Sequence, residues 1–119
     1  MEQPALQIVR SSITRADLAA VASRQFGDMV KAVVDLDRTL MAIGAELHSD
    51  EEAALLEDGS TQQALWGINL YPGEEGDGLV EFDAMINVRP SQGNRSRGVE
   101  SDATRERIRR VVRQLVSDA

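Results

Sequence analysis

The sequence predicts an α+β domain of two layers: a mostly antiparallel five-stranded sheet with three helices on one face. Two observations support this class. Stretches of alternating apolar and polar residues, which are typical of strands, occur in adjacent pairs that hairpins can join. Three amphipathic stretches at helical spacing lie between or after these pairs, and each needs an apolar surface to cover. The predicted order is β-α-β-β-α-β-β-α, in one domain over residues 1–119.

The first strand and the first helix are predicted from short local signals. A strand is expected over residues 6–10, which are mostly apolar. Thr14 precedes apolar residues at helical spacing, and Asp17 follows it three residues later, as in a capping box. Gly27 can end the helix, because glycine enters the left-handed backbone region without strain. We therefore expect a helix between Thr14 and Gly27.

A hairpin and a second helix should follow. Residues 30–36 largely alternate in polarity, and residues 40–47 are apolar on both faces, as a central strand should be. Ser49 and Glu52 have the spacing of a second capping box. Gly59 then closes a short helix.

A second hairpin and a long helix complete the prediction. Residues 66–71 and 80–89 alternate in polarity and should pair as antiparallel strands. The last helix is expected to begin near Ser101 or Asp102. Its apolar stripe consists of Ile108, Val111, Val112, Leu115 and Val116.

The composition excludes several classes of protein. The chain contains no cysteine, so it has neither disulfides nor thiolate metal sites. Its net charge of −7 argues against general nucleic-acid binding, which needs a cationic surface. The N-terminus lacks a secretory signal, and no stretch approaches the roughly 20 apolar residues of a membrane span. We expect a soluble cytoplasmic protein without membrane contact, and we expect neither a metal nor a cofactor.

The charge is distributed unevenly along the chain. Residues 1–88 carry 5 basic and 16 acidic side chains, whereas residues 89–119 carry 8 basic and 4 acidic ones. Glu57 and Asp58 end the predicted second helix, although acidic residues there oppose its dipole. Arginines of the basic segment could neutralise them. The same asymmetry would allow the basic end of one subunit to bind the acidic body of another, which predicts a homo-oligomer.

The stretch RPSQGNRSRGVE, from Arg89 to Glu100, is the predicted functional surface. Arg89, Arg95 and Arg97 carry planar guanidinium groups that match phosphate or carboxylate geometry. Four more hydrogen-bonding side chains lie between them: Ser91, Gln92, Asn94 and Ser96. Together these groups could hold an anionic small molecule. In the alternative interpretation, the arginines bind acidic residues of the body or of a neighbouring subunit.

Polar residues outside this loop form a second candidate site. Asp83 and Asn87 lie on one face of the last predicted strand, and Asn69 lies on its neighbour. A buried Asp83 could act as a general base, although antiparallel sheets commonly have one solvated face. His48 is the only histidine and lies two residues after Glu46. It could serve as a base or a metal ligand, or it could simply flank the second helix.

Four stretches are familiar as a set: FGDMVKAVVD, GAELHSDEEAALLEDGS, LWGINLYP and EFDAMINVRPSQGNRSRGVE. They resemble a family of short, uncharacterised prokaryotic proteins that is classed as a domain of unknown function. The resemblance covers roughly residues 26–100, and RPSQGNRSRGVE is its most distinctive part. It implies a free-standing domain but no activity and no catalytic residue.

Three hypotheses for function remain open. The first is a small homo-oligomeric binding module that holds an anionic ligand or an acidic partner at loop 89–98. The second is an enzyme acting on a phosphorylated or carboxylated small molecule, with Asp83, Glu46 or His48 as acid or base. The third is a structural interaction protein whose loop closes a subunit interface.

Overall fold

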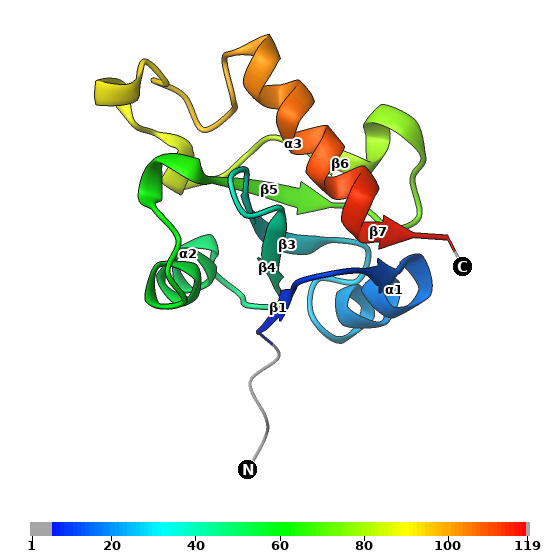
Figure 1. Cartoon of the computed structure of the whole chain (residues 1–119). Coiled ribbons are helices and arrows are strands. Elements are labelled where there is room, and N and C mark those ends of the chain that lie inside the picture. The colour runs from blue at the N-terminus through cyan, green and yellow to red at the C-terminus, as the bar shows by residue number, and fades with distance from the viewer. Residues whose placement is uncertain (1–5, 119) are drawn as a thin grey trace.

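The computed structural model describes residues 6–118 and confirms the α+β class (Figure 1). Its main sheet contains five antiparallel strands in the order β1-β4-β3-β5-β6. These strands are β1 (Gln7–Val9), β3 (Val30–Asp35), β4 (Leu40–Ile43), β5 (Leu65–Leu70) and β6 (Val80–Glu81). The three helices are α1 (Arg15–Arg24), α2 (His48–Glu57) and α3 (Asp102–Leu115).

A second, two-stranded sheet joins the two ends of the described chain. Strand β2 (Ile13–Thr14) pairs in parallel with β7 (Val116–Ser117), and Ile13 lies opposite Val116. The sequence did not predict this pair, because two residues per strand are too few for a polarity pattern. The pair holds the end of α3 beside the start of α1 (Figure 1).

Side-chain caps fix the starts of the first and last helices; the sequence predicts the cap at Thr14 and, for the last helix, only a start near Ser101 or Asp102. The Thr14 hydroxyl accepts a hydrogen bond from the amide of Asp17 at 3.0 Å. The Ser101 hydroxyl accepts one from the amide of Thr104 at 3.2 Å. Gly27 follows α1 with a φ of 93°, which confirms it as a left-handed residue after the helix. None of the helices within residues 6–118 is long and apolar enough to cross a membrane.

The start of α2 differs from the prediction. The helix begins at His48, Leu47 occupies the cap position, and no side chain caps it, so the expected capping box of Ser49 and Glu52 is wrong. The buried carboxyl of Glu51 instead accepts a hydrogen bond from the amide of Ala45 at 3.0 Å. This bond ties the helix to the segment before it.

The helices lie on both faces of the sheet, whereas we expected all three on one face. α1 and α3 contribute Leu18 and Ile108 to the larger hydrophobic cluster, and α2 contributes Leu55 to a separate one. Strand β3 explains the difference, because successive side chains point to opposite faces and Val34 and Val33 belong to different clusters. α2 therefore covers the face opposite to α1 and α3 (Figure 1).

The predicted strand over residues 80–89 is wrong beyond Glu81. The chain leaves β6 and forms short 3₁₀ turns at Met85–Asn87 and Pro90–Gln92. This segment crosses β5 so closely that a Cβ atom on Gly67 would lie 2.5 Å from the Cβ of Ala84. The Asn87 side chain takes the place of a paired strand, because it accepts from Gly67 N at 2.8 Å and donates to Gly67 O at 2.9 Å.

Candidate functional site

Two buried asparagines hold the loop in shape. The side-chain amide of Asn94 donates to the carbonyl oxygens of Asn87, Ser96 and Gly98 at 2.7, 3.1 and 2.8 Å. Its oxygen accepts a hydrogen bond from the amide of Glu100 at 2.9 Å. Asn87 donates to the carbonyl oxygen of Arg97 at 3.0 Å in addition to its contacts with β5. Both asparagines were predicted to bind a ligand, but their side chains bind the chain itself.

Arg89 is also committed to the fold. Its side chain is buried, with only 9% of the residue exposed, and one guanidinium nitrogen donates to the carbonyl of Gln62 at 2.7 Å. A second nitrogen donates to the carbonyl of Leu65, and the group stacks over the ring of Trp66, 4.4 Å from its centre. Burial lowers the pKa of Arg89. It therefore braces the start of β5 and presents no guanidinium to a ligand.

Backbone amides of the loop bind a carboxylate that belongs to the loop itself, the side chain of Glu100. One oxygen of Glu100 accepts hydrogen bonds from the amides of Arg95 and Ser96 at 2.6 and 2.9 Å. The Arg95 amide is the main cause of the lowered pKa of Glu100. Consecutive amides that face one oxygen are typical of an anion-binding nest. The predicted chemistry of the loop is present, but a bound ligand would have to displace Glu100 from these amides.

Two arginines of the loop remain at the surface. Arg97 is paired through Nε with Asp83 at 2.7 Å, and 57% of its side chain is exposed. Its two terminal nitrogens have no hydrogen-bond partner within residues 6–118. The Arg95 guanidinium makes no ion pair within the same range. Asp83 is half-buried and ion-paired, not a buried base.

The other polar side chains predicted in the loop contribute less. Gln92 accepts a hydrogen bond from Arg89 at 3.2 Å, so it supports the buried guanidinium. Ser91 and Ser96 are exposed at the surface of the loop. The Ser96 hydroxyl also bonds Glu100 and contributes to the lowered pKa of that carboxyl.

A polar row crosses the sheet next to the loop, on the face that α2 covers. Asn69 of β5 lies between Lys31 of β3 and Glu81 of β6 in the register. Its side-chain nitrogen donates to the Glu81 carboxylate at 2.9 Å and to the carbonyl of Asp83 at 3.3 Å. The Tyr71 hydroxyl donates to the same Glu81 oxygen at 3.0 Å. Asn69 is only 6% exposed, yet its side-chain oxygen has no partner among the described residues.

His48 lies beside this row at the first turn of α2. Its Nε2 is 2.8 Å from the carbonyl oxygen of Ile68, and because a carbonyl only accepts, Nε2 carries a hydrogen. Burial is the largest influence on the ring and lowers its pKa, and Lys31 lowers it further. The Ile68 carbonyl, Asn69 and Asp83 act in the opposite direction. The neutral ring therefore offers an unprotonated Nδ1 next to the polar row.

The carboxylate of Glu46 does not contribute to the polar row. Its backbone carbonyl accepts a hydrogen bond from Lys31 Nζ at 2.8 Å, and its side chain is exposed. Among the described residues, no group of three histidine, cysteine, aspartate or glutamate side chains is arranged to hold a metal ion.

Glu51 is a buried polar group that sequence reasoning missed. It has no exposed surface, burial raises its pKa to about 9, and one carboxyl oxygen has no partner within the described chain. The carboxyl is therefore protonated at neutral pH. Glu51 precedes Leu55 by four residues and shares its helix face, so a helical pattern that admits polar residues would have placed it inside.

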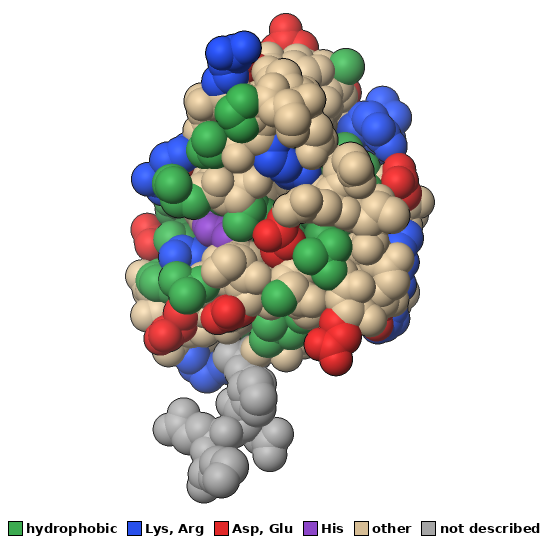
Figure 2. All heavy atoms as spheres, turned by 90° about the vertical axis from the view of Figure 1, so that its left-hand side faces the viewer, with side chains coloured by type: hydrophobic (Ala, Val, Ile, Leu, Met, Phe, Trp, Pro, Cys, Tyr) green, Lys and Arg blue, Asp and Glu red, His purple; other side chains and the backbone are tan. Residues whose placement is uncertain are grey.

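Exposed apolar side chains flank His48 and the polar row. Leu47 precedes His48 and is 54% exposed, and Met85 follows Asp83 by two residues and is 65% exposed. Phe26 is also exposed and lies under the Lys31 ammonium, 5.1 Å from the ring centre. Figure 2 shows hydrophobic side chains around the histidine on this face, interspersed with charged groups of both signs.

The basic C-terminal segment is neutralised largely within its own chain. Arg107 lies 3.8 Å from Asp37 and Arg109 lies 3.8 Å from Asp77, in addition to the pair of Arg97 with Asp83. The acidic end of α2 is neutralised differently from our expectation. Asp58 receives Arg10 at 2.8 Å and Arg38 at 2.7 Å, both from the acidic part of the chain.

Comparison with known proteins places the chain in a family without assigning a role. No curated protein and no solved structure matches it. The family model of a protein of unknown function, DUF5674, matches residues 7–115, which include the whole main sheet, all three helices and the loop. The resemblance to an uncharacterised domain family is thereby confirmed, and the chain belongs to the DUF5674 family of proteins of unknown function.

Proposed function

We propose that the protein is a small binding module that recognises a phosphate or carboxylate group through Arg95 and Arg97. One observation carries the proposal. Asp83 holds Nε of Arg97 at 2.7 Å and leaves the two terminal nitrogens of the same guanidinium without a partner in the described chain. Such a fork can bind two oxygens of one anion while its orientation stays fixed.

The loop supports this role because its shape is already set. Asn87, Asn94 and Glu100 satisfy the main-chain groups on both sides of Arg95 and Arg97. A binding group on an ordered backbone loses less conformational freedom when a ligand arrives. Ordered polar loops on a rigid scaffold are common positions for recognition residues.

The polar row beside the loop would determine which anions bind. The free oxygen of Asn69 and the Nδ1 of neutral His48 are hydrogen-bond acceptors, and Tyr71 supplies a hydroxyl. These groups favour a ligand that carries donors, such as hydroxyl or amino groups, next to its anionic group. Buried acceptors left without a donor would penalise ligands that lack such groups.

Binding of simple anions tests the proposal directly. We expect inorganic phosphate, pyrophosphate or succinate at 10 mM to raise the melting temperature of the wild-type chain. The variant carrying both Arg95→Ala and Arg97→Ala should show no such rise. Arg113→Ala removes an exposed arginine of α3 and serves as the control. An equal rise in the double variant, or no rise with any anion in the wild type, would refute the proposal.

An enzyme is the second candidate, favoured by the neutral His48 beside Asp83 and the Arg97 fork. Here His48 would act as a general base on a phosphorylated or carboxylated small molecule. In this case His48→Gln should abolish turnover of such a substrate and leave the anion-induced rise in melting temperature intact. Loss of both would assign His48 to binding.

Self-association stays a prediction, as does a cytoplasmic location. The exposed side chains of Leu47 and Met85 favour a second copy as the partner that covers this face. Light scattering should give a mass above the 13.0 kDa of one chain, and Met85→Asp should return it to the monomer value. A wild-type chain that stays monomeric at about 100 μM would refute self-association at that concentration.

A further inference from the structure

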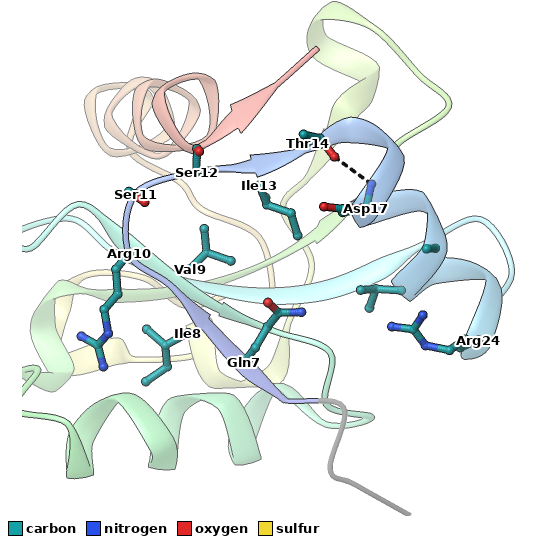
Figure 3. A pocket seen from close by; sticks show the side chains of 12 residues that line it. Gln7, Ile8, Val9, Arg10, Ser11, Ser12, Ile13, Thr14, Asp17 and Arg24 are labelled. Carbon is teal, nitrogen blue, oxygen red and sulfur yellow. Dashed lines mark hydrogen bonds between the residues drawn. The ribbon is translucent and has the colours of Figure 1, made fainter. Parts of the chain in front are cut away.

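The outer edge of β1 borders a groove that takes no part in the loop or the polar row. β1 is the terminal strand of the main sheet, and among residues 6–118 only its inner edge is paired, with β4. The groove lies between this strand, the turn into β2 and helix α1, with a volume of about 540 Å³ (Figure 3). Ligand sites in proteins commonly have volumes of about 300–1,000 Å³.

The groove has an apolar floor and a polar rim. Val9, Ile13 and Val21 form the floor and are each at most 8% exposed. The rim consists of Gln7, Ser11, Ser12, Asp17 and Arg24. In Figure 3, Gln7 and Arg24 lie toward one end, and Ser11 and Ser12 lie toward the other. An apolar floor with a few polar groups around it is the usual lining of a binding site.

The rim groups are free, although neighbouring arginines are not. Arg10 points to the other face of the sheet and binds Asp58, and Arg15 binds Asp118 at 2.8 Å. The side chains of Asp17 and Arg24 have no hydrogen-bond or ion-pair partner within residues 6–118. A cation and an anion thus stand unpaired on the same wall of the groove.

We propose that this groove binds an extended peptide segment of a partner protein, which adds to β1 as a further strand of the main sheet. The segment carries an acidic side chain beside Arg24 and a basic side chain beside Asp17. Its backbone pairs with the outward-facing amide and carbonyl groups of Gln7–Val9, and an apolar side chain between the charges packs on Val21.

The spacing of the charges fits an extended peptide. Asp17 and Arg24 are seven residues apart on α1, which corresponds to about 10 Å along the helix axis. A strand covers that distance in about three residues. A segment of four or five residues can therefore reach both charges while it pairs with β1.

A peptide suits the groove better than the other occupants. An unpaired strand edge offers a row of alternating hydrogen-bond donors and acceptors, and a small molecule has no matching row with which to pair. A second copy of this chain at the same edge is the alternative that light scattering tests below. The mixed charges of the rim instead match a short segment with one charge of each sign.

A labelled model peptide tests the inference with the full chain. The probe is a fluorescein-labelled pentapeptide of lysine, valine, threonine, valine and glutamate, capped at both ends. Fluorescence anisotropy gives its affinity, and hydrogen exchange reads those amides of Gln7–Val9 that face away from β4. We expect saturable binding and slower exchange at these amides. Arg24→Glu should weaken binding roughly tenfold, which corresponds to one charge contact.

Two controls separate the charge contact from a change of fold. Arg113→Glu makes the same charge change on an exposed site of α3 and should leave the affinity unchanged. A second peptide, in which lysine replaces the glutamate, should bind the Arg24→Glu variant at least as tightly as it binds the wild type. This rescue is not expected from a misfolded variant.

Three results would overturn the proposal. The first is no binding at millimolar peptide, and the second is binding without slower exchange at Gln7–Val9. The third is a free chain that is dimeric by light scattering and already protected at these amides, which would assign the edge to a second copy. Shifts confined to loop 89–98 would count as the second result.

Discussion

Replacing Asn87 should destabilise the protein more than any surface change in the loop. The side chain is fully buried and makes three hydrogen bonds to main-chain groups, with Gly67 N, Gly67 O and Arg97 O at 2.8, 2.9 and 3.0 Å. Asn87→Ala leaves the amide and the carbonyl of Gly67 without these partners, whereas the Arg97 carbonyl keeps its hydrogen bond from the amide of Ala84 at 3.0 Å. These groups belong to β5 and to the loop, so the variant weakens the connection between the two, and Arg89 still bonds β5.

The magnitude follows from these three contacts. A lost hydrogen bond costs about 1 kcal/mol, and a buried group left unsatisfied costs about 1–3 kcal/mol. We therefore expect Asn87→Ala to lower the free energy of unfolding by about 3–5 kcal/mol. That loss is a large part of the roughly 5–15 kcal/mol that stabilises a typical domain.

Asn87→Asp adds a dependence on pH. The new carboxylate can accept from Gly67 N, but its other oxygen faces the carbonyls of Gly67 and Arg97 and repels them. Protonation restores one donor, so the pKa of the new carboxyl is raised in the folded state. A raised pKa means that stability is lost as the pH rises above the unfolded value. The destabilisation should be about 1–3 kcal/mol smaller at pH 5 than at pH 7.5.

Urea denaturation at both pH values measures these effects. Ser91→Ala, on the exposed surface of the same loop, is the matched control and should change the free energy of unfolding by less than about 0.5 kcal/mol. If Asn87→Ala costs less than about 1 kcal/mol, or if the effect of Asn87→Asp does not change with pH, the contacts of Asn87 do not hold the loop on β5.

Four further predictions test other buried and polar groups. The pKa of His48 is lowered, so the folded state binds fewer protons than the unfolded state. The urea midpoint should therefore fall as the pH drops below 6.5. His48→Gln should make this decrease of the midpoint smaller. The pKa of Glu51 is raised from 4.5 to about 9, so the contribution of Glu51 to stability is lost as the pH rises between these two values. Glu51→Gln should therefore raise the free energy of unfolding by about 2 kcal/mol at pH 7.5 and by less at pH 5. Gly67→Ala should lower the free energy of unfolding by about 1–3 kcal/mol, because its Cβ would lie 2.5 Å from a neighbouring side chain, whereas Gly73→Ala has open space and should be close to neutral; equal midpoints for the two variants would contradict this packing. Glu100→Ala empties the nest of loop amides and should tighten phosphate binding several-fold in calorimetry, and unchanged binding would show that the nest is not used.

The sequence predicted the elements that depend on neighbours in the chain. Thr14 and Ser101 cap helices through bonds three residues away, so their signals are complete within one short window. Strand β3 and its pairing with β4 follow from local alternation and a short turn. These interactions need no knowledge of the rest of the fold.

The prediction of the last strand was wrong because the contact that prevents the strand involves Gly67, which lies far away in the sequence. Residues 80–88 do alternate in polarity, which is sufficient for a strand in isolation. Gly67, about twenty residues earlier, lets the segment approach β5 closely, and Asn87 then bonds the exposed edge of that strand. No local pattern reports such a pairing between a side chain and a strand.

The sequence predicted which residue types form the candidate site better than it predicted the role of each side chain. Arginine, asparagine and glycine in one loop suit both an anion site and a loop that satisfies its own backbone. The structure divides these uses: Arg89, Asn87 and Asn94 face inward, and Arg95 and Arg97 remain outside. Sequence reasoning cannot separate them, because the same side chains serve either purpose until their burial is known.

The parallel pair of β2 and β7 also bears on how the protein is made. Ile13 and Val116 are neighbours in space but lie about 100 residues apart along the chain, and α3 covers the sheet just before that pair forms. On the ribosome, the face of the sheet beneath α3 must therefore stay uncovered until α3 and β7 have left the exit tunnel. We expect nascent chains truncated at about residue 100 to engage chaperones, and the emergence of α3 and β7 to end this exposure.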